Sequence, residues 1–154
     1  SVADFPAPVR GGAAGEPWTL LDEADCIVFG CPTYMGSVSA DFKRFMDHTS
    51  GAWGQQKWRD KLAAGFTNSG APSGDKLSTL QAISAFAGQH SMVWVSTGVP
   101  MADGLNAVGG FLGLMTTSAN GPPDETPDER DRETSRRFGA RVAEATARWV
   151  RGRG

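Results

Sequence analysis

The 154-residue sequence has few of the residues that build disulfides, metal sites or membrane spans. It contains two cysteines, Cys26 and Cys31, two histidines and one tyrosine. The cysteines lack CxxC spacing, so we expect two buried or half-buried thiols and a reducing, cytoplasmic location. No His, Cys, Asp or Glu cluster has the spacing of metal ligands, and no apolar stretch approaches the roughly 18 residues that cross a bilayer. We therefore predict neither a metal site nor a membrane span.

Charge and sequence signatures exclude further classes of function. The net charge is −2 and charged residues make up 21% of the chain, so nothing favours nucleic acid or an anionic membrane as a partner. The glycine patterns GxGxxG and GxxxxGK[ST], which cradle nucleotide phosphates, are absent. A Ser-His-Asp hydrolase has no GxSxG turn to support it. The length suits one domain over residues 1–154 with a hydrophobic core.

The most informative segment is an apolar run, Cys26–Phe29, followed by Gly30 and a polar-aromatic turn over 32–36. The run predicts a buried strand, and the residues after it predict a helix over about Ser39–His48. Open α/β sheets bind ligands at loops of this kind, where strands end. The turn offers the hydroxyl of Thr33, the ring of Tyr34 and an unobstructed N–H at Gly36.

Two more strands and three more helices are predicted. The strands are Leu62–Thr67 and Met92–Ser96. The first helix, Trp18–Asp25, is a short helix or turn. The second is capped by Asp75 and has apolar residues on one side, namely Leu77, Leu80, Ile83 and Phe86. The third spans about 132–151 and should bury Phe138, Val142, Ala145 and Trp149. Strands that alternate with helices favour βαβ units, so we predict an α/β fold with a parallel sheet.

Two segments have no clear periodicity. Residues Ser1–Pro17 are rich in Pro, Gly and Ala and read as a linker or the end of a strand. Residues Val99–Asp131 form a long predicted loop, and loops of such length often act as lids or contacts between subunits. A further loop, Gly51–Lys57, contains Trp53.

The loops after Phe29 and after Thr67 should project from the same edge of the sheet. Both contain Gly, Pro, Ser, Thr or Asn and few charges. Such loops suit a neutral ring held by backbone hydrogen bonds better than a metal or a charged substrate.

The combined pattern resembles the flavodoxin-like superfamily, and within it the tryptophan-repressor-binding-protein type of NAD(P)H:quinone oxidoreductase and related NADPH-dependent FMN reductases. Three segments carry the resemblance, in family order: FGCPTYMGSVSADFKRFMD (Phe29–Asp47), SGAWGQQKWRDKLAAGFTNSG (Ser50–Gly70) and QHSMVWVSTG (Gln89–Gly98). The resemblance implies a three-layer fold with helices on both faces of a parallel sheet, and bound FMN.

The resemblance also implies roles for particular residues. The flavin ring would be held by Pro32, Thr33, Tyr34, Met35, Gly36 and Ser37. Its pyrimidine edge would meet Asn68, Ser69 and Gly70, largely through backbone groups. His90 matches a histidine near the flavin and is the candidate for polarising or protonating an acceptor oxygen, and Trp53 matches an aromatic that closes the pocket, often from a neighbouring subunit.

Each of these residues also has a structural interpretation. Tyr34 would then be a surface turn residue, His90 a histidine bonded to a carbonyl, and Trp53 part of the core or an interface. Asn68 and Ser69 would only end a strand.

One part of the family pattern is missing. The first strand and the Ser/Thr-rich loop that holds the FMN phosphate should precede residue 18, and Ser1–Pro17 contains neither. The first strand is central in the order 2-1-3-4-5, so we expect the Cys26–Phe29 strand to be unpaired on one side. Either the sequence begins partway through the protein, with Val2–Phe5 left from the second strand, or the complete chain has a non-flavin role or borrows the strand from another copy.

The predicted function is therefore an FMN-dependent oxidoreductase that passes electrons from NAD(P)H to a quinone-like acceptor, as a homodimer or homotetramer. One alternative is a flavodoxin-type electron-transfer protein. The other is a flavin-free scaffold of the same fold.

Overall fold

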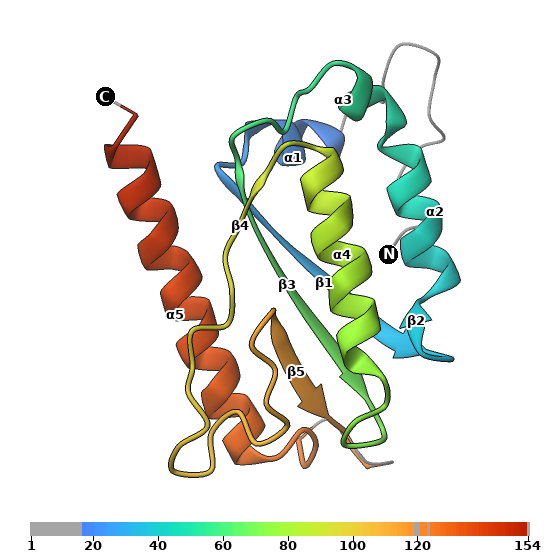
Figure 1. The fold of residues 1–154 in the computed structure, drawn as a ribbon, viewed down its shortest axis with the longest axis vertical. Coiled ribbons are helices and arrows are strands. Elements are labelled where there is room, and N and C mark those ends of the chain that lie inside the picture. The colour runs from blue at the N-terminus through green and yellow to red at the C-terminus, as the bar shows by residue number, and fades with distance from the viewer. Residues whose placement is uncertain (1–16, 119–120, 123, 154) are drawn as a thin grey trace.

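The computed structural model describes residues 17–118, 121–122 and 124–153, which form a layered α/β fold (Figure 1). In chain order the elements are α1 (Trp18–Glu23), β1 (Cys26–Tyr34), β2 (Ser37–Val38), α2 (Ala40–His48), α3 (Ser50–Gly54), β3 (Leu62–Ser69), α4 (Lys76–Gln89), β4 (Val93–Trp94), β5 (Leu114–Thr117) and α5 (Glu129–Arg151). Strand β3 runs parallel to β1, β4 and β5. The predicted α/β class with a parallel sheet is confirmed.

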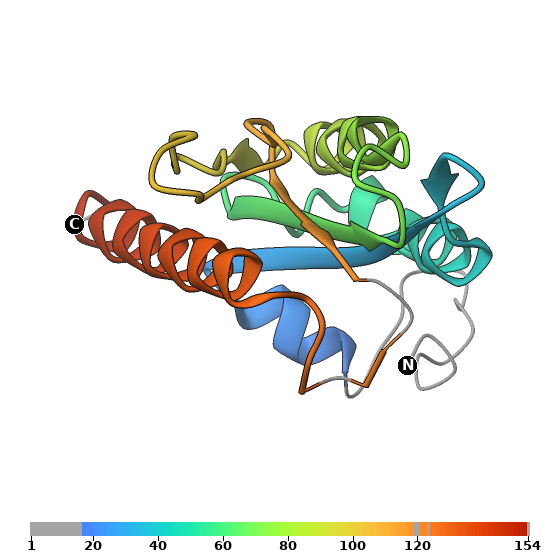
Figure 2. The same ribbon diagram turned by 90° about the horizontal axis from the view of Figure 1, so that it is seen from below.

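Side chains that alternate along the strands bury both faces of the sheet. On one face Ile27 and Phe29 join an aromatic and aliphatic cluster with α2 and α4. On the other face Leu62 and Ala64 cluster with Phe138 of α5. Figure 2 shows α4 and α5 on opposite sides of the sheet. Three of the four predicted apolar residues of α4 are buried, whereas Leu77 is exposed.

Strand β1 is longer than predicted. Its pairing with β3 extends from Cys26 opposite Leu62 to Pro32 opposite Asn68. Pro32 has no backbone N–H, which a strand tolerates on an unpaired edge. The predicted loop over 32–36 is therefore mostly strand, and only its last two residues form the turn.

The chain reverses direction at Met35 and Gly36, whose φ angles are 48° and 73°. Two consecutive positive φ angles are typical of the two-residue hairpin turns that match the twist of antiparallel strands. Residues Thr33 and Tyr34 accordingly pair antiparallel with β2. Gly36 is required here because a side chain would strain the left-handed backbone.

The region after α4 differs most from the prediction. The expected strand Met92–Ser96 is reduced to β4, which pairs only with the first two residues of β3. The chain then leaves the sheet and returns as β5 beside Phe66–Ser69. Thus β4 and β5 share one side of β3, and the long loop predicted over Val99–Asp131 contains a strand. A Cβ at Gly113 would lie 2.6 Å from the Gly65 carbonyl oxygen, so the return requires glycine.

Strand β1 lacks a neighbour along most of its outer edge within the part of the chain that the structure describes. The sheet order is β2-β1-β3-β4, and β2 reaches only the last two residues of β1. Over the described residues, the expected unpaired edge is present. On the α5 side of the sheet, Val28 and Phe66 are 46% and 42% exposed. The open edge of β1 has backbone groups free to pair with a further strand, and the exposed apolar side chains could be covered by a further helix.

The remaining predictions are mostly confirmed, with shifted boundaries. Trp53 lies in the short helix α3 rather than in a loop, and α5 begins three residues earlier than expected. Asp75 is at the N-cap position of α4, but its side chain makes no capping hydrogen bond. Cys26 is half-buried and Cys31 is buried, both as free thiols. The expected linker or strand remnant at 1–16 lies outside the described residues.

The contrast between two glycines tests the packing of β5. Gly113→Ala should destabilise the fold by about 1–3 kcal/mol, because the new methyl group meets backbone. Gly139→Ala, in the middle of α5 with nothing near its Cβ, should instead stabilise by about 0.5–1 kcal/mol. Urea unfolding of the two variants and the parent measures both changes. Equal stability of the Gly113→Ala variant and the parent would contradict the close approach of β5 to β3.

Candidate functional site

The two predicted loops meet at one end of the sheet. The Thr33 and Thr67 hydroxyls lie 2.7 Å apart, joining the ends of β1 and β3. The Ser78 hydroxyl of α4 donates a hydrogen bond to the Gly36 carbonyl, which ties the hairpin to the helix. The structure thus brings Pro32–Ser37 together with Asn68–Gly70, as the sequence predicted.

The hairpin tip presents large side chains to solvent. Tyr34 is 64% exposed and Met35 is fully exposed. Pro32 and Ser37 are also exposed, and Gly36 is half-buried. These groups are available to a flat ligand that lies across the end of the sheet.

Thr33 differs from the prediction. It is on the buried face of β1, and its hydroxyl contacts Thr67 and donates to Thr79 Oγ1 at 2.8 Å. The alternation that puts Tyr34 outside puts Thr33 inside. The Thr33 hydroxyl therefore holds the two turns together, rather than pointing toward a ligand.

Asn68 has one buried polar atom without a partner. Its Nδ2 donates to Ser118 Oγ at 2.7 Å, whereas its Oδ1 is buried and accepts no hydrogen bond from the described residues. Asn68 lines one end of an apolar groove of about 610 Å³ between α5 and the sheet, next to Phe66 and Thr116. A buried acceptor without a donor fits a ligand that carries an N–H group, such as the pyrimidine edge of a flavin.

Behind the second loop lies a buried lysine that the sequence analysis missed. Lys76 is 1% exposed, and its Nζ donates to Ser69 Oγ at 3.0 Å, to the Ala71 carbonyl at 2.8 Å and to Thr117 Oγ1 at 3.1 Å. Burial lowers the pKa of the Lys76 ammonium, and the negative charge of Asp131 opposes that shift. The three hydrogen bonds fix the course of the chain directly after Ser69.

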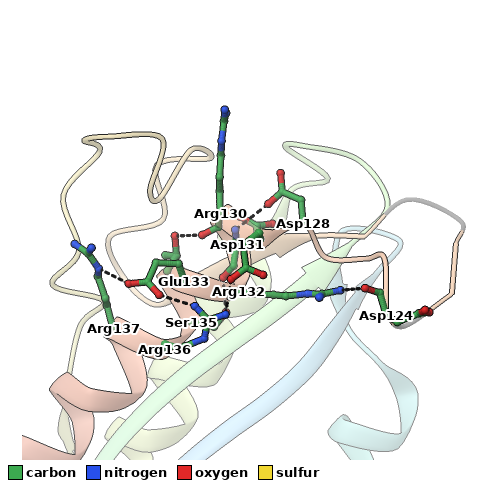
Figure 3. Close-up of polar contacts among 11 residues, drawn as sticks. Asp124, Asp128, Arg130, Asp131, Arg132, Glu133, Ser135, Arg136 and Arg137 are labelled. Carbon is green, nitrogen blue, oxygen red and sulfur yellow. Dashed lines mark hydrogen bonds and ion pairs between the residues drawn. The ribbon is translucent and has the colours of Figure 1, made fainter.

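Asp131, in the first turn of α5, is the acidic counterpart of this lysine. Its carboxylate accepts a hydrogen bond from the Thr117 backbone N–H at 2.7 Å and is 7% exposed. Burial raises the pKa of Asp131, whereas the hydrogen bond from Thr117 and the charge of Lys76 lower it. Figure 3 shows Asp131 beside Asp128, the N-cap of α5, and Arg132 reaching toward Asp124.

A sequence signal for Lys76 did exist. A basic residue in the first turn of a helix opposes the helix dipole, so Lys76 directly after the predicted cap Asp75 needed an explanation. Asp131 gave a weaker signal, because acidic residues are common at helix starts. Thr117 gave none, because β5 itself was not predicted.

His90 and Trp53 are not part of this site within one chain. His90 directly follows α4, whose 14 residues span about 20 Å from the loop at Lys76. It is 1% exposed, stacks against Trp58 at 4.4 Å between ring centroids, and contacts Thr49 Oγ1 through Nε2 at 2.9 Å. Within one chain, His90 therefore does not lie at the two turns.

Trp53 lies near His90, at the end of the sheet away from the two turns. It is 48% exposed and lines the same shallow groove between α2 and α4 as His90. Trp53 therefore cannot close the loop site of its own chain.

Over the described ranges, no group of three or more His, Cys, Asp or Glu residues is arranged to hold a metal ion. None of the described helices is long and apolar enough to cross a membrane. The segment expected to hold the FMN phosphate, before residue 18, falls almost entirely on residues outside the described ranges.

Comparison with known proteins assigns the family. The model of the NADPH-dependent FMN reductase family matches residues 12–106. The chain belongs to this family. The resemblance to flavodoxin-like oxidoreductases found in the sequence is thereby confirmed.

Individual members of this and related families are also similar to the chain. Flavodoxin FldP of Pseudomonas aeruginosa is 40% identical over 141 residues, covering 87% of this chain and 77% of the relative. A NAD(P)H dehydrogenase (quinone) of Archaeoglobus fulgidus is 33% identical over 124 residues, covering 80% of this chain and 60% of the relative. The crystal structure of a flavodoxin, WrbA-like protein from Agrobacterium tumefaciens has a TM-score of 0.70 at 40% identity, covering 91% of this chain and 77% of that one. The chain thus spans between three fifths and about three quarters of these relatives.

The buried histidine makes a testable contribution to stability. Burial lowers the pKa of His90 to about 4 from 6.5. Below about pH 6.5 the histidine is protonated in the unfolded chain but stays neutral in the folded chain. The free energy of unfolding therefore falls as the pH drops below that value. Between pH 6.5 and 5 the loss should be about 1.5 kcal/mol. Urea unfolding over this range should show a smaller loss for His90→Gln, and equal pH slopes in variant and parent would refute the prediction.

Proposed function

We propose that this chain binds FMN at the turns following β1 and β3 and passes electrons from NAD(P)H to a quinone-like acceptor. The observation that carries the proposal is the unsatisfied Asn68 Oδ1 where the two turns converge. Membership of the NADPH-dependent FMN reductase family supports the choice of cofactor and donor. The relatives named as quinone dehydrogenases support the class of acceptor.

In this proposal the cofactor carries the chemistry and the protein orients it. Bound FMN supplies the hydride and electron transfer. Asn68 accepts a hydrogen bond from the pyrimidine edge, and the backbone N–H of Gly70 is a further donor there. Tyr34, at the hairpin tip, offers an aromatic face to the ring. The buried Thr33–Thr67 contact keeps the two turns at a fixed separation.

The proposal includes assembly into a homodimer or homotetramer. Trp53 is half-exposed at the far end of the sheet, and so could reach a loop site only on a neighbouring copy. A subunit arrangement in which Trp53 closes the neighbour's pocket would exclude water from the ring. The free thiols of Cys26 and Cys31 are consistent with a cytoplasmic location.

A flavodoxin-type electron carrier is the second candidate. It is favoured by the relative at 40% identity, which is named a flavodoxin. The two candidates share the flavin site and differ in the electron donor. An enzyme oxidises NAD(P)H rapidly when a quinone is present, whereas a carrier is reduced rapidly only by a protein partner. A flavin-free scaffold would bind no FMN at all.

Variants at the two turns test the site. Asn68→Ala should weaken FMN binding by about five- to tenfold, the effect of one lost hydrogen bond. Replacing Tyr34 by Ala and Gly36 by Val together should abolish retention, because the turn at φ 73° cannot hold valine without strain. Quenching of FMN fluorescence on binding measures the dissociation constant.

Two controls separate a lost contact from general destabilisation. Gln81→Ala removes an amide from the exposed surface of α4 and should leave FMN affinity unchanged. Gly104→Val imposes similar backbone strain at φ 77°, beside Arg130 of α5 rather than within either turn. Unchanged FMN affinity in both site variants would refute the site. Absence of FMN binding by the parent chain would refute both flavin functions.

A further inference from the structure

Lys76 and Asp131 form a pair of buried opposite charges joined through a single residue. Lys76 donates to the side chain of Thr117, and the backbone N–H of Thr117 donates to Asp131. Both charged side chains are at least nine-tenths buried. Moving charges out of water costs free energy, and a buried ion pair often adds nothing to the stability of the fold. The Lys76–Asp131 pair is therefore a candidate for a functional role.

The lysine is the nearer of the two charges to the second loop. Its Nζ contacts Ser69 Oγ and the Ala71 carbonyl, on either side of Gly70. Asp131 instead accepts a hydrogen bond from the backbone N–H of Thr117 in β5, the strand next to β3. Asp131 therefore lies farther from the loop after β3 than Lys76 does. The electrostatic potential that the pair creates at Ser69 and Gly70 is therefore positive, and Asp131 reduces it.

Two carboxylates also lie near the pair. Asp75 precedes Lys76 and lies beside Gly36 of the hairpin, and Asp128 lies beside Asp131 and raises its pKa. All three N–H groups of the Lys76 ammonium are used within the protein. Lys76 can therefore act on a ligand at the loop only through its field and through the position of the loop.

We propose that Lys76 raises the reduction potential of a flavin held at the β3–α4 loop and that Asp131 limits this rise. The inference rests on the proposed binding of FMN. A hydride from NAD(P)H brings two electrons and one proton, so the reduced ring anion carries one more negative charge than the oxidised ring. A buried positive charge near the ring favours the reduced state, and a buried negative charge disfavours it.

The direction of the change in reduction potential distinguishes an electrostatic role of the two residues from a purely structural one. If the two residues only support the loop, removal of either weakens flavin binding, and the reduction potential has no reason to move in opposite directions. If their charges act on the ring, Lys76→Met lowers the potential and Asp131→Asn raises it. Lys76 is thus a positioning residue whose charge also shifts the reduction potential of the flavin.

The experiment compares reduction potentials of the FMN-loaded chain and its variants, measured by equilibration with a reference dye. Lys76→Met should favour the oxidised flavin by about tenfold, which corresponds to a fall of about 30 mV for two electrons. Asp131→Asn should raise the potential by a smaller amount. The control Arg148→Met removes an exposed positive charge near the C-terminal end of α5 and should leave the potential unchanged.

A double variant, Lys76→Met with Asp131→Asn, keeps the test decisive if Lys76→Met alone does not fold. Its potential should lie below that of Asp131→Asn. Shifts of the same sign in the single variants, or no shifts, would overturn the inference while FMN binding by the parent leaves the proposed function standing. Failure of the parent to bind FMN would overturn both.

Discussion

The site depends on strand β3, because every element that contributes to it is attached to the last residues of that strand. Thr67 bonds to Thr33 and so fixes the hairpin. Ser69 accepts from Lys76 of α4 and pairs with Thr117 of β5. Strand β3 is bordered by β1 on one edge and by β4 and β5 on the other. Side chains at its carboxyl end are therefore held in place by the whole sheet.

This attachment also accounts for the buried threonine hydroxyls and the buried lysine at the carboxyl end of the sheet. The three threonine hydroxyls at positions 33, 67 and 79 satisfy one another, and the Lys76 ammonium has three acceptors. Removing one partner of such a network leaves the others buried without hydrogen bonds, at a cost of about 1–3 kcal/mol for each neutral group. The network thus specifies one arrangement of the turns. Asn68 Oδ1, by contrast, is buried without a hydrogen-bond partner among the described residues, and Asn68 lines the groove between α5 and the sheet.

The sequence was sufficient for those features that depend on local periodicity. The apolar run at Cys26–Phe29, the helix over Ser39–His48 and the face of α4 through Leu80 and Ile83 all follow from alternation or helical spacing. Strand β5 could not be predicted in this way, because four residues inside a glycine-rich stretch carry no period. It is a strand because β3 offers a free edge there and because Gly113 lets the two backbones approach.

The position of His90 relative to the two turns also depends on features that the sequence does not show. Family resemblance placed His90 near the ring, but α4 carries the chain back along the sheet before His90 is reached. The two ends of the sheet consequently differ in chemistry. The amino end holds His90 in contact with Trp58 and Phe86, an apolar environment that lowers the pKa of the histidine. The carboxyl end holds hydroxyls, an amide and the Lys76–Asp131 pair. Residues at the first end can influence a ligand at the second only through another copy of the chain, so within one subunit the chemistry must come from the ends of β1, β3 and β5.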